Sequence, residues 1–159
     1  MLFVGTLLYI IQRYKYIKFL VENEENIYFE QILEDDNQKT DIRIYHNILF
    51  EGEADHLIER YKSRLNRSGG VGENGTTIYG DFRTSSSGFI SRSEDEVVFR
   101  IEERISRLLN TSISRMERFQ ILNYKKGQKF SFHYDFFHSL DESGQQIHLN
   151  IGGQRYVSI

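Results

Sequence analysis

The sequence predicts an α+β protein with a mainly β core, in which supporting helices come first and the sheet comes last. Segments before residue 110 show the apolar period of amphipathic helices. From residue 119 onward, apolar and polar residues alternate as they do in strands. The chain lacks Trp but has 10 Tyr and 12 Phe, which fits β-rich packing. Helices followed by a run of strands are typical of α+β domains.

Composition limits the classes of protein that the chain can represent. Its 159 residues suit one domain, and 39% apolar with 27% charged residues is a soluble, globular composition. The net charge of -3 gives no electrostatic reason to expect nucleic acid as the main partner. Without Cys, disulfides and thiolate metal sites are excluded. Without Pro, turns must be made by Gly, Asn, Asp and Ser.

Residues 1–40 are predicted to be an apolar N-terminal segment and an acidic linker. Leu2 to Ile11 is apolar and is followed by basic residues. The run is shorter than the roughly 20 residues that span a bilayer. Two interpretations remain open: membrane association or targeting through residues 2–20, and a terminus packed on the domain. Glu22 to Lys39 is acidic and polar, and is predicted to be a linker or the solvated face of a lead-in helix.

Three short Asn-x-Ser/Thr sequons are compatible with a lumenal location such as the endoplasmic reticulum. They begin at Asn66, Asn74 and Asn110. Motifs of this length arise often by chance, so location is not determined by them.

The predicted domain, residues 41–159, opens with a strand, a helix and a loop. The strand runs from Asp41 to Phe50, with apolar residues at Ile42 and Ile44. Glu53 to Leu65 has one apolar face and is predicted to be a helix. Arg67 to Gly80 is rich in Gly and Ser and is predicted to be a loop. The chain from residue 78 to residue 90 is predicted to be extended.

The clearest predicted helix begins at Ser93. Glu96 follows three residues later, which is the capping-box pattern. An apolar stripe then indicates core packing rather than chemistry. The stripe consists of Val97, Val98, Ile101, Ile105, Leu108 and Leu109.

The second half of the domain is predicted to be mostly strands. Phe119 to Tyr124 and Phe130 to Tyr134 alternate as strands, and Lys125 to Gln128 is predicted to be the hairpin turn between them. A polar loop follows from Ser139 to Gln146, and a last strand is expected from near Arg155.

The residues with the strongest chemical interest are His133 and Asp135. Positions i and i+2 of a strand face the same side. An imidazole and a carboxylate on one face make two corners of the 2-His-1-carboxylate site that holds Fe(II). By spacing alone, a His at a strand end beside a turn Asp is the favoured alternative.

The neighbouring motifs favour the metal site. The stretch from Gln120 to Asp135 resembles the prolyl 4-hydroxylase family, in which a Gln, a strand Tyr, a Gly-Gln turn and His-x-Asp recur in this order. Arg83 to Phe89 is similar to the family's Arg-Thr-Ser segment, and Gly152 to Arg155 is similar to its Gly-Gly-Gln-Arg segment. The resemblance covers about Asp41 to Ile159, and several ordered motifs are more specific than any one.

The resemblance implies roles for single residues. His133 and Asp135 are the implied Fe(II) ligands, and Tyr124 the residue whose hydroxyl approaches 2-oxoglutarate. A buried strand aromatic is the alternative for Tyr124. Phe130 stands where the family commonly has Tyr, which keeps an aromatic wall but loses a hydroxyl. The residues that the resemblance implies for substrate binding are Arg155, Arg83 and Phe130.

Two of these roles have plain alternatives. Arg155 is implied to lie near a peptide-binding groove, but an ordinary solvent-facing arginine is an equal alternative. Arg83 to Ser87, with the Gly-rich stretch before it, is compatible with part of a substrate-covering lid. A plain surface loop is slightly preferred there.

For the whole domain, the resemblance implies a double-stranded β-helix, or jelly roll, with N-terminal supporting helices. It also implies hydroxylation of peptidyl proline to 4-hydroxyproline, with Fe(II), 2-oxoglutarate as cosubstrate and ascorbate as reductant. The family's distal His, basic 2-oxoglutarate residue and last strands are expected beyond Ile159. His138 and His148 are expected to be surface residues, and this stretch of chain alone is expected to be inactive.

Two other classes of function stay open. One is a non-catalytic fragment or pseudoenzyme that acts as a binding module. The other is a β-barrel that holds a different metal for a structural purpose.

Overall fold

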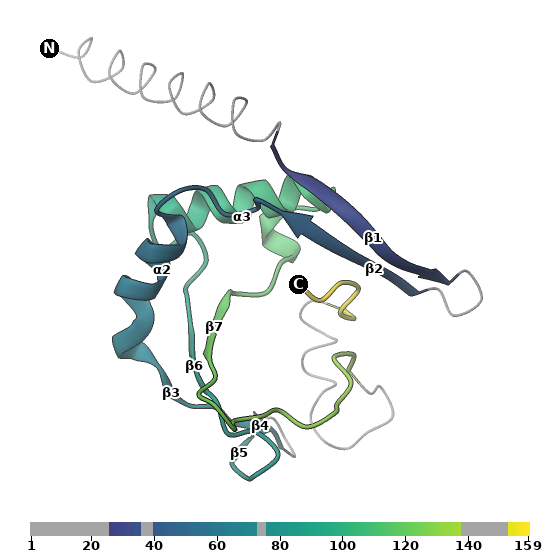
Figure 1. Ribbon diagram of the computed structural model, residues 1–159. Helices are drawn as coiled ribbons and strands as arrows, with labels where there is room; N and C mark the ends of the chain where they lie inside the picture. Colours follow the sequence, from purple (N-terminus) through teal and green to yellow (C-terminus); the bar gives the residue numbers. More distant parts are fainter. Residues whose placement is uncertain (1–25, 36–39, 73–75, 138–152) are drawn as a thin grey trace, which may run out of the picture. The chain divides into compact units, whose positions relative to one another are not determined.

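The computed structural model describes residues 26–35, 40–72, 76–137 and 153–159, and Figure 1 shows them as a coloured ribbon. The described chain is a mixed α/β structure with antiparallel strands. It divides into two compact units, Met1–Ala54 and Asp55–Ile159. The predicted division after residue 40 stays a prediction.

The first unit contains an antiparallel hairpin of β1 (Tyr28–Asp35) and β2 (Thr40–His46). The ring of Tyr28 stacks on its cross-strand partner His46, with ring centroids 4.5 Å apart. Contacts between facing side chains across the two strands stabilise the hairpin. Residues 28–35 therefore form a strand, and the linker predicted there is wrong. Strand β2 ends before the predicted Phe50, since Asn47 has a φ of 57° that breaks the extended backbone.

Helix α2 (Glu53–Tyr61) and the 3-10 turn η1 (Lys62–Arg64) confirm the first predicted helix. At the N-terminal end of α2, the Glu53 carboxylate accepts a hydrogen bond from the Phe50 N–H, at 2.9 Å. This bond satisfies one of the backbone donors that precede a helix.

Helix α3 (Glu96–Leu108) also forms where the apolar stripe predicts it, but the capping box at Ser93 is wrong. The N-cap is Asp95, whose carboxylate accepts from the Val98 N–H at 2.9 Å. Ser93 has a φ of 50° and donates instead, through its N–H and its hydroxyl, to Glu102. A cap needs extended backbone immediately before the helix, and Asp95 supplies it with φ -147° and ψ 177°.

A three-stranded antiparallel sheet lies in the second unit, in the order β3-β6-β7. Its strands are β3 (Asn66–Arg67), β6 (Ser86–Phe89) and β7 (Gln120–Asn123). Strand β6 is central, and Ser85, directly before it, is 1% exposed. The surface loop and the lid predicted as alternatives for Arg83 to Ser87 are therefore wrong for Ser86 and Ser87, because these residues pair with strands on both sides.

The segment predicted to be a Gly-rich loop contains a second, small pair of strands, β4 (Gly70–Val71) and β5 (Thr77–Ile78). Glycine permits the close packing there, because a Cβ on Gly70 would lie 2.7 Å from the ring of Phe82. The loop prediction is therefore wrong at these two strands.

The turn predicted at Lys125 to Gln128 is confirmed, but the strand predicted after it is wrong. The Gln128 N–H donates to the Lys125 carbonyl at 2.9 Å, and Gly127 has a φ of 85°. Beyond the turn, Ser131 donates to the Phe82 carbonyl at 2.8 Å, and residue 129 accepts from Thr84. The chain there pairs with residues 82–84 and not with β7, so no hairpin ladder continues through residues 130–134.

Among described residues 153–159 there is no strand, so the last strand predicted near Arg155 is wrong for that stretch. Leu2 to Ile11 and the loop from Ser139 to Gln146 lie outside the described residues. Within the described part of the chain, no helix has both the length and the apolar character needed to cross a membrane.

The core of the second unit joins both helices to the sheet. Tyr61 of α2, Ile90 after β6 and Val98 of α3 are at most 1% exposed and cluster together. Partly buried Leu57, Phe119 and Ile121 pack against them. The described strands form small separate sheets and no closed barrel. The mixed, antiparallel character is confirmed at this level, and the double-stranded β-helix stays a prediction.

Candidate metal site

Both predicted iron ligands lie on the segment from Phe130 to Phe137, which we call the ligand segment. At its start, an isolated bridge joins Phe130 to Arg83. At its end, the Gln154 carboxamide accepts from the Phe137 N–H at 2.7 Å and donates to the Phe137 carbonyl at 2.8 Å. The segment contains no strand, and these contacts hold its two ends.

The imidazole of His133 is oriented by one hydrogen bond. Its Nδ1 lies 2.7 Å from the carbonyl oxygen of Ser131. A carbonyl oxygen only accepts, so Nδ1 carries the proton of this bond. In the neutral imidazole, which is the form that binds a metal, Nε2 then has the lone pair. Metal-binding histidines are commonly oriented in this way, through their second ring nitrogen.

The carboxylate of Asp135 faces Nε2 of this imidazole. Its Oδ1 lies 3.4 Å from His133 Nε2, and its Oδ2 accepts from the Ser158 hydroxyl at 2.6 Å. Both side chains are partly exposed, at 42% for His133 and 51% for Asp135. One carboxylate oxygen is thus held by the protein while the other points toward the imidazole.

The pair fits two positions of an iron site. Two donor atoms bound at about 2.1 Å and at right angles lie about 3.0 Å apart, near the observed spacing. A neutral imidazole and a carboxylate are also the required ligand types. Within the described part of the chain, no group of three metal-binding side chains occurs, and His138 and His148 lie outside that part.

Two of the predicted substrate-binding residues form a stack with His133. The rings of Phe130 and His133 are stacked, with centroids 3.7 Å apart and planes 21° apart. The guanidinium carbon of Arg83 lies 4.3 Å from the Phe130 centroid. The Arg83 guanidinium also donates to the Gly69 carbonyl at 3.0 Å and to the Gln120 side chain at 3.4 Å.

Arg155 lies at the other end of the ligand segment. Its guanidinium makes a bidentate ion pair with Glu117, at 2.5 Å and 2.9 Å, which raises the pKa of Arg155 above its usual value. Its remaining terminal nitrogen donates to the Asp135 carbonyl at 3.1 Å. The guanidinium carbon lies 4.5 Å from the Phe137 ring centroid. Arg155 is exposed, as the solvent-facing alternative expects, but its guanidinium also has partners within the chain. Its implied role near a peptide-binding groove stays a prediction.

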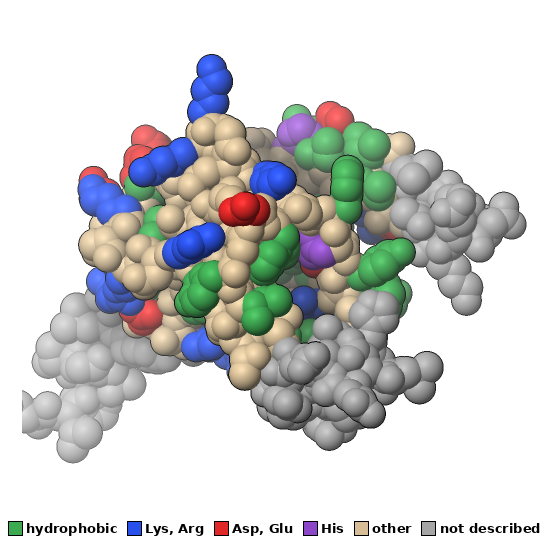
Figure 2. Space-filling view, turned by 90° about the horizontal axis from the view of Figure 1, so that it is seen from below, with side chains coloured by type: hydrophobic (Ala, Val, Ile, Leu, Met, Phe, Trp, Pro, Cys, Tyr) green, Lys and Arg blue, Asp and Glu red, His purple; other side chains and the backbone are tan. Residues whose placement is uncertain are grey.

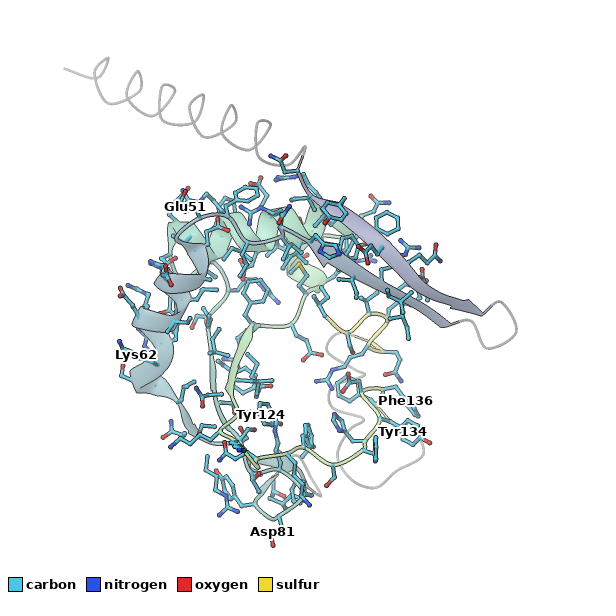
Figure 3. The ribbon with its side chains drawn as sticks, viewed as in Figure 1. Glu51, Lys62, Asp81, Tyr124, Tyr134 and Phe136 are labelled. Atoms are coloured by element: carbon cyan, nitrogen blue, oxygen red, sulfur yellow. The ribbon has the colours of Figure 1, made fainter. Side chains whose placement is uncertain are left out.

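Tyr124, predicted to approach 2-oxoglutarate, follows β7 directly and is 43% exposed. The buried-aromatic alternative is therefore wrong in this structure. In Figure 3, Tyr124 lies apart from Tyr134, the residue between the two ligands, whereas Tyr134 and Phe136 are neighbours with ring centroids 4.9 Å apart.

On the face drawn in Figure 2, exposed hydrophobic side chains are interspersed with Lys and Arg.

Three residues of the site carry no role in the sequence prediction. They are Ser131, Ser158 and the Gln154 carboxamide, which orient His133, Asp135 and Phe137. Gln154 belongs to the Gly-Gly-Gln-Arg motif, which identifies its position in the sequence. The motif does not predict that its partner is Phe137. Nothing local distinguishes Ser131 or Ser158, because their roles depend on groups brought close by folding.

Several known proteins similar to this chain are named prolyl 4-hydroxylases or probable prolyl 4-hydroxylases. Prolyl 4-hydroxylase 2 of Arabidopsis thaliana is 31% identical over 160 residues, which cover 100% of this chain and 50% of the relative. Prolyl 4-hydroxylase 5 of the same plant is 39% identical over 117 residues, or 73% of this chain and 38% of the relative. Probable prolyl 4-hydroxylase 4 is 35% identical over 118 residues. No protein-family model matches the chain.

Prolyl 4-hydroxylases are oxidoreductases, and the chain is related to this class of protein. The chain belongs to the prolyl 4-hydroxylase family. It spans about half the length of the first relative and 38% of the second.

Proposed function

We propose that the chain supplies two of the three protein ligands of an Fe(II)- and 2-oxoglutarate-dependent dioxygenase. The reaction proposed for the complete protein is hydroxylation of peptidyl proline to 4-hydroxyproline. One observation carries the proposal: His133 Nε2 and Asp135 Oδ1 lie 3.4 Å apart in the motif that marks the ligands in the resembling family. The names of the relatives support the substrate class.

The proposed roles of His133 and Asp135 as ligands follow from the hydrogen bonds of their side chains. Ser131 holds the tautomer of His133 in which Nε2 can bind a metal. Ser158 leaves Asp135 Oδ1 directed at the same point. The bound metal would supply the oxidative chemistry, with 2-oxoglutarate and oxygen as cosubstrates. The contribution of the chain is the ligand geometry.

The remaining parts of the proposal rest on the resemblance to the family. The third ligand and the basic residue for 2-oxoglutarate are assigned to other residues of the complete protein, in a double-stranded β-helix. Tyr124 is proposed to approach 2-oxoglutarate, and ascorbate is the proposed reductant. A proline-containing peptide is the proposed substrate, in the endoplasmic reticulum or in association with a membrane through residues 2–20.

The test replaces His133 in the protein expressed from its complete gene. The His133→Ala protein is expected to lose more than about 100-fold of its Fe(II)-dependent turnover of a proline peptide, since loss of a ligand exceeds the loss of a ligand's hydrogen-bond partner. Succinate release and peptide hydroxylation are the measurements. Undiminished turnover would reject the assignment.

A matched control exists in the second unit. His56 is also paired with a carboxylate, with its Nε2 2.9 Å from Asp95 Oδ2. The His56→Ala protein loses a comparable His–Asp contact, but its turnover per folded molecule is expected to stay at the wild-type level. Thermal unfolding of both variants separates loss of ligand from loss of fold.

A further inference from the structure

The three Asn-x-Ser/Thr sequons of the chain have no part in the proposed iron site. They begin at Asn66, Asn74 and Asn110. Asn74 lies outside the described residues, so the structure compares the other two. An N-linked glycan is bulky and hydrated, so the asparagine that carries it must be accessible to solvent in the folded protein.

The Asn110 sequon lies where helix α3 ends. Asn110 follows the C-cap Leu109 and has a φ of 48°. Its N–H donates to the Arg107 carbonyl at 3.1 Å. The Thr111 N–H donates to the Ser106 carbonyl at 2.9 Å. These two bonds form the Schellman motif, in which the residue after the C-cap has the left-handed conformation. The motif ends the helix, and the Asn110 side chain is exposed.

Helix termination explains the asparagine of this sequon but not its serine. Asparagine adopts the left-handed conformation more readily than most residues, so Asn110 has a structural reason of its own. Ser112 has extended backbone and precedes the 3-10 turn η3 (Ile113–Arg115). Although the structure describes this turn in full, the Ser112 side chain makes no capping hydrogen bond to it. Its exposed hydroxyl, which lies 2.9 Å from that of Ser114, supplies the hydroxyl that a sequon requires.

The Asn66 sequon has a different environment. Asn66 belongs to β3 and pairs with Ser87 of β6. Its carboxamide donates to the Arg64 carbonyl at 3.2 Å. Ser68, which supplies the hydroxyl of this sequon, is 1% exposed and accepts from the Ser85 hydroxyl at 3.0 Å. In the folded chain, the carboxamide and the hydroxyl of this sequon are therefore both engaged, and the hydroxyl is buried.

From this comparison we propose that Asn110 is a site of N-linked glycosylation. The proposal goes beyond the proposed function and rests on it only for the location in the endoplasmic reticulum. The sugar donor is a lipid-linked oligosaccharide. A bond forms between the Asn110 carboxamide nitrogen and the anomeric carbon of the first sugar, and the bond from that carbon to the lipid pyrophosphate breaks. The nitrogen loses one proton, and the lipid pyrophosphate leaves.

The test translates the complete gene in the presence of microsomes from the endoplasmic reticulum. Protection from added protease reports whether the domain has entered the lumen. Enzymatic release of N-glycans in heavy-oxygen water converts each modified asparagine to a labelled aspartate, which peptide mass spectrometry locates. The label is expected at Asn110 and not at Asn66.

Single substitutions separate glycosylation from helix termination. Ser112→Ala keeps Asn110 but removes the hydroxyl, so it is expected to lose the glycan, whereas Ser112→Thr keeps a hydroxyl and is expected to keep the glycan. Asn110→Gly preserves the left-handed residue that ends α3 and is expected to lose the glycan. In protein made in bacteria without glycans, these variants are expected to unfold at the same urea concentration as wild type. Asn66→Gln is the matched control and is expected to leave the glycan on Asn110.

A protease-protected chain without a glycan on Asn110 would overturn the proposal, and so would a glycan that persists on Asn110 in Ser112→Ala. A chain that is digested by the protease and carries no glycan would overturn both the glycosylation and the lumenal location. The iron site depends on neither result, because the turnover of His133→Ala tests it separately.

Discussion

At the residue scale, Asp95 shows how one carboxylate connects two helices. One oxygen caps α3 through the Val98 N–H, and the other contacts His56 at 2.9 Å and Arg60 at 3.0 Å, both on α2. Burial raises the pKa of Asp95, but the hydrogen bonds from Val98 and His56 and the charge of Arg60 outweigh burial. The pKa of Asp95 is therefore lower than its usual 3.8.

This lowered pKa predicts a pH-dependent stability. A carboxyl with a lower pKa in the folded chain contributes stability that is fully present above its unfolded pKa and is lost as the pH falls through the folded pKa. Asp95→Asn keeps a good N-cap but removes the charge. Its free energy of unfolding is expected to be lower at neutral pH and to fall less steeply below about pH 4. Urea unfolding at a series of pH values measures both effects.

Two further variants sharpen the comparison. Asp95→Ala also loses the cap, which costs about 0.5–2 kcal/mol. Asp81→Asn removes an exposed carboxylate and is expected to leave the acid dependence as in wild type. An acid dependence of Asp95→Asn equal to that of wild type would contradict the assignment to Asp95.

At the element scale, the small β4–β5 pair depends on glycine. A Cβ on Gly70 would meet the Phe82 ring at 2.7 Å, and the Phe82 carbonyl accepts from Ser131 at the start of the ligand segment. The position of Phe82 therefore matters both to the packing of this pair and to the segment that carries the proposed ligands.

Gly70→Ala is expected to lower the free energy of unfolding by about 1–3 kcal/mol, because the added methyl overpacks the contact with Phe82. Chemical denaturation measures the change. The same substitution in a Phe82→Leu background is expected to cost less, since the shorter side chain leaves room for the methyl. Equal costs in the two backgrounds would show that the ring is not what the methyl meets.

At the scale of the whole molecule, each compact unit has its own basis for stability. The first unit depends on the paired strands β1 and β2 with their stacked and tilted aromatic pairs. The second depends on a core in which Tyr61, Ile90 and Val98 bring α2, the chain after β6 and α3 together. Loss of packing at that core should therefore affect the second unit as a whole.

Ile90→Ala tests this core. Ile90 is 1% exposed, and its truncation is expected to lower the free energy of unfolding by about 2–5 kcal/mol through lost burial and a residual cavity. Ile58 on α2 is 58% exposed, so Ile58→Ala is expected to stay within about 0.5 kcal/mol of wild type. Thermal or urea unfolding compares them, and equal effects would contradict the central place of Ile90.

Features that depend on near neighbours along the chain can be predicted from the order of residues alone. The apolar face of α3, the helical period of α2 and the turn at Gly127 all follow from contacts within a few residues. His133 and Asp135 were identified as candidate ligands in the same way, by their spacing and by the motifs around them.

Contacts between distant groups are visible only in the folded chain. In the fold, residues 28–35 pair with β2, and the chain after Gly127 lies against residues 82–84. The cap of α3 is Asp95 and not Ser93. The side chain of Arg155 likewise pairs with Glu117, 38 positions away in the sequence. Such contacts depend on backbone angles and on chain segments brought together by folding, and no local pattern of residues specifies them.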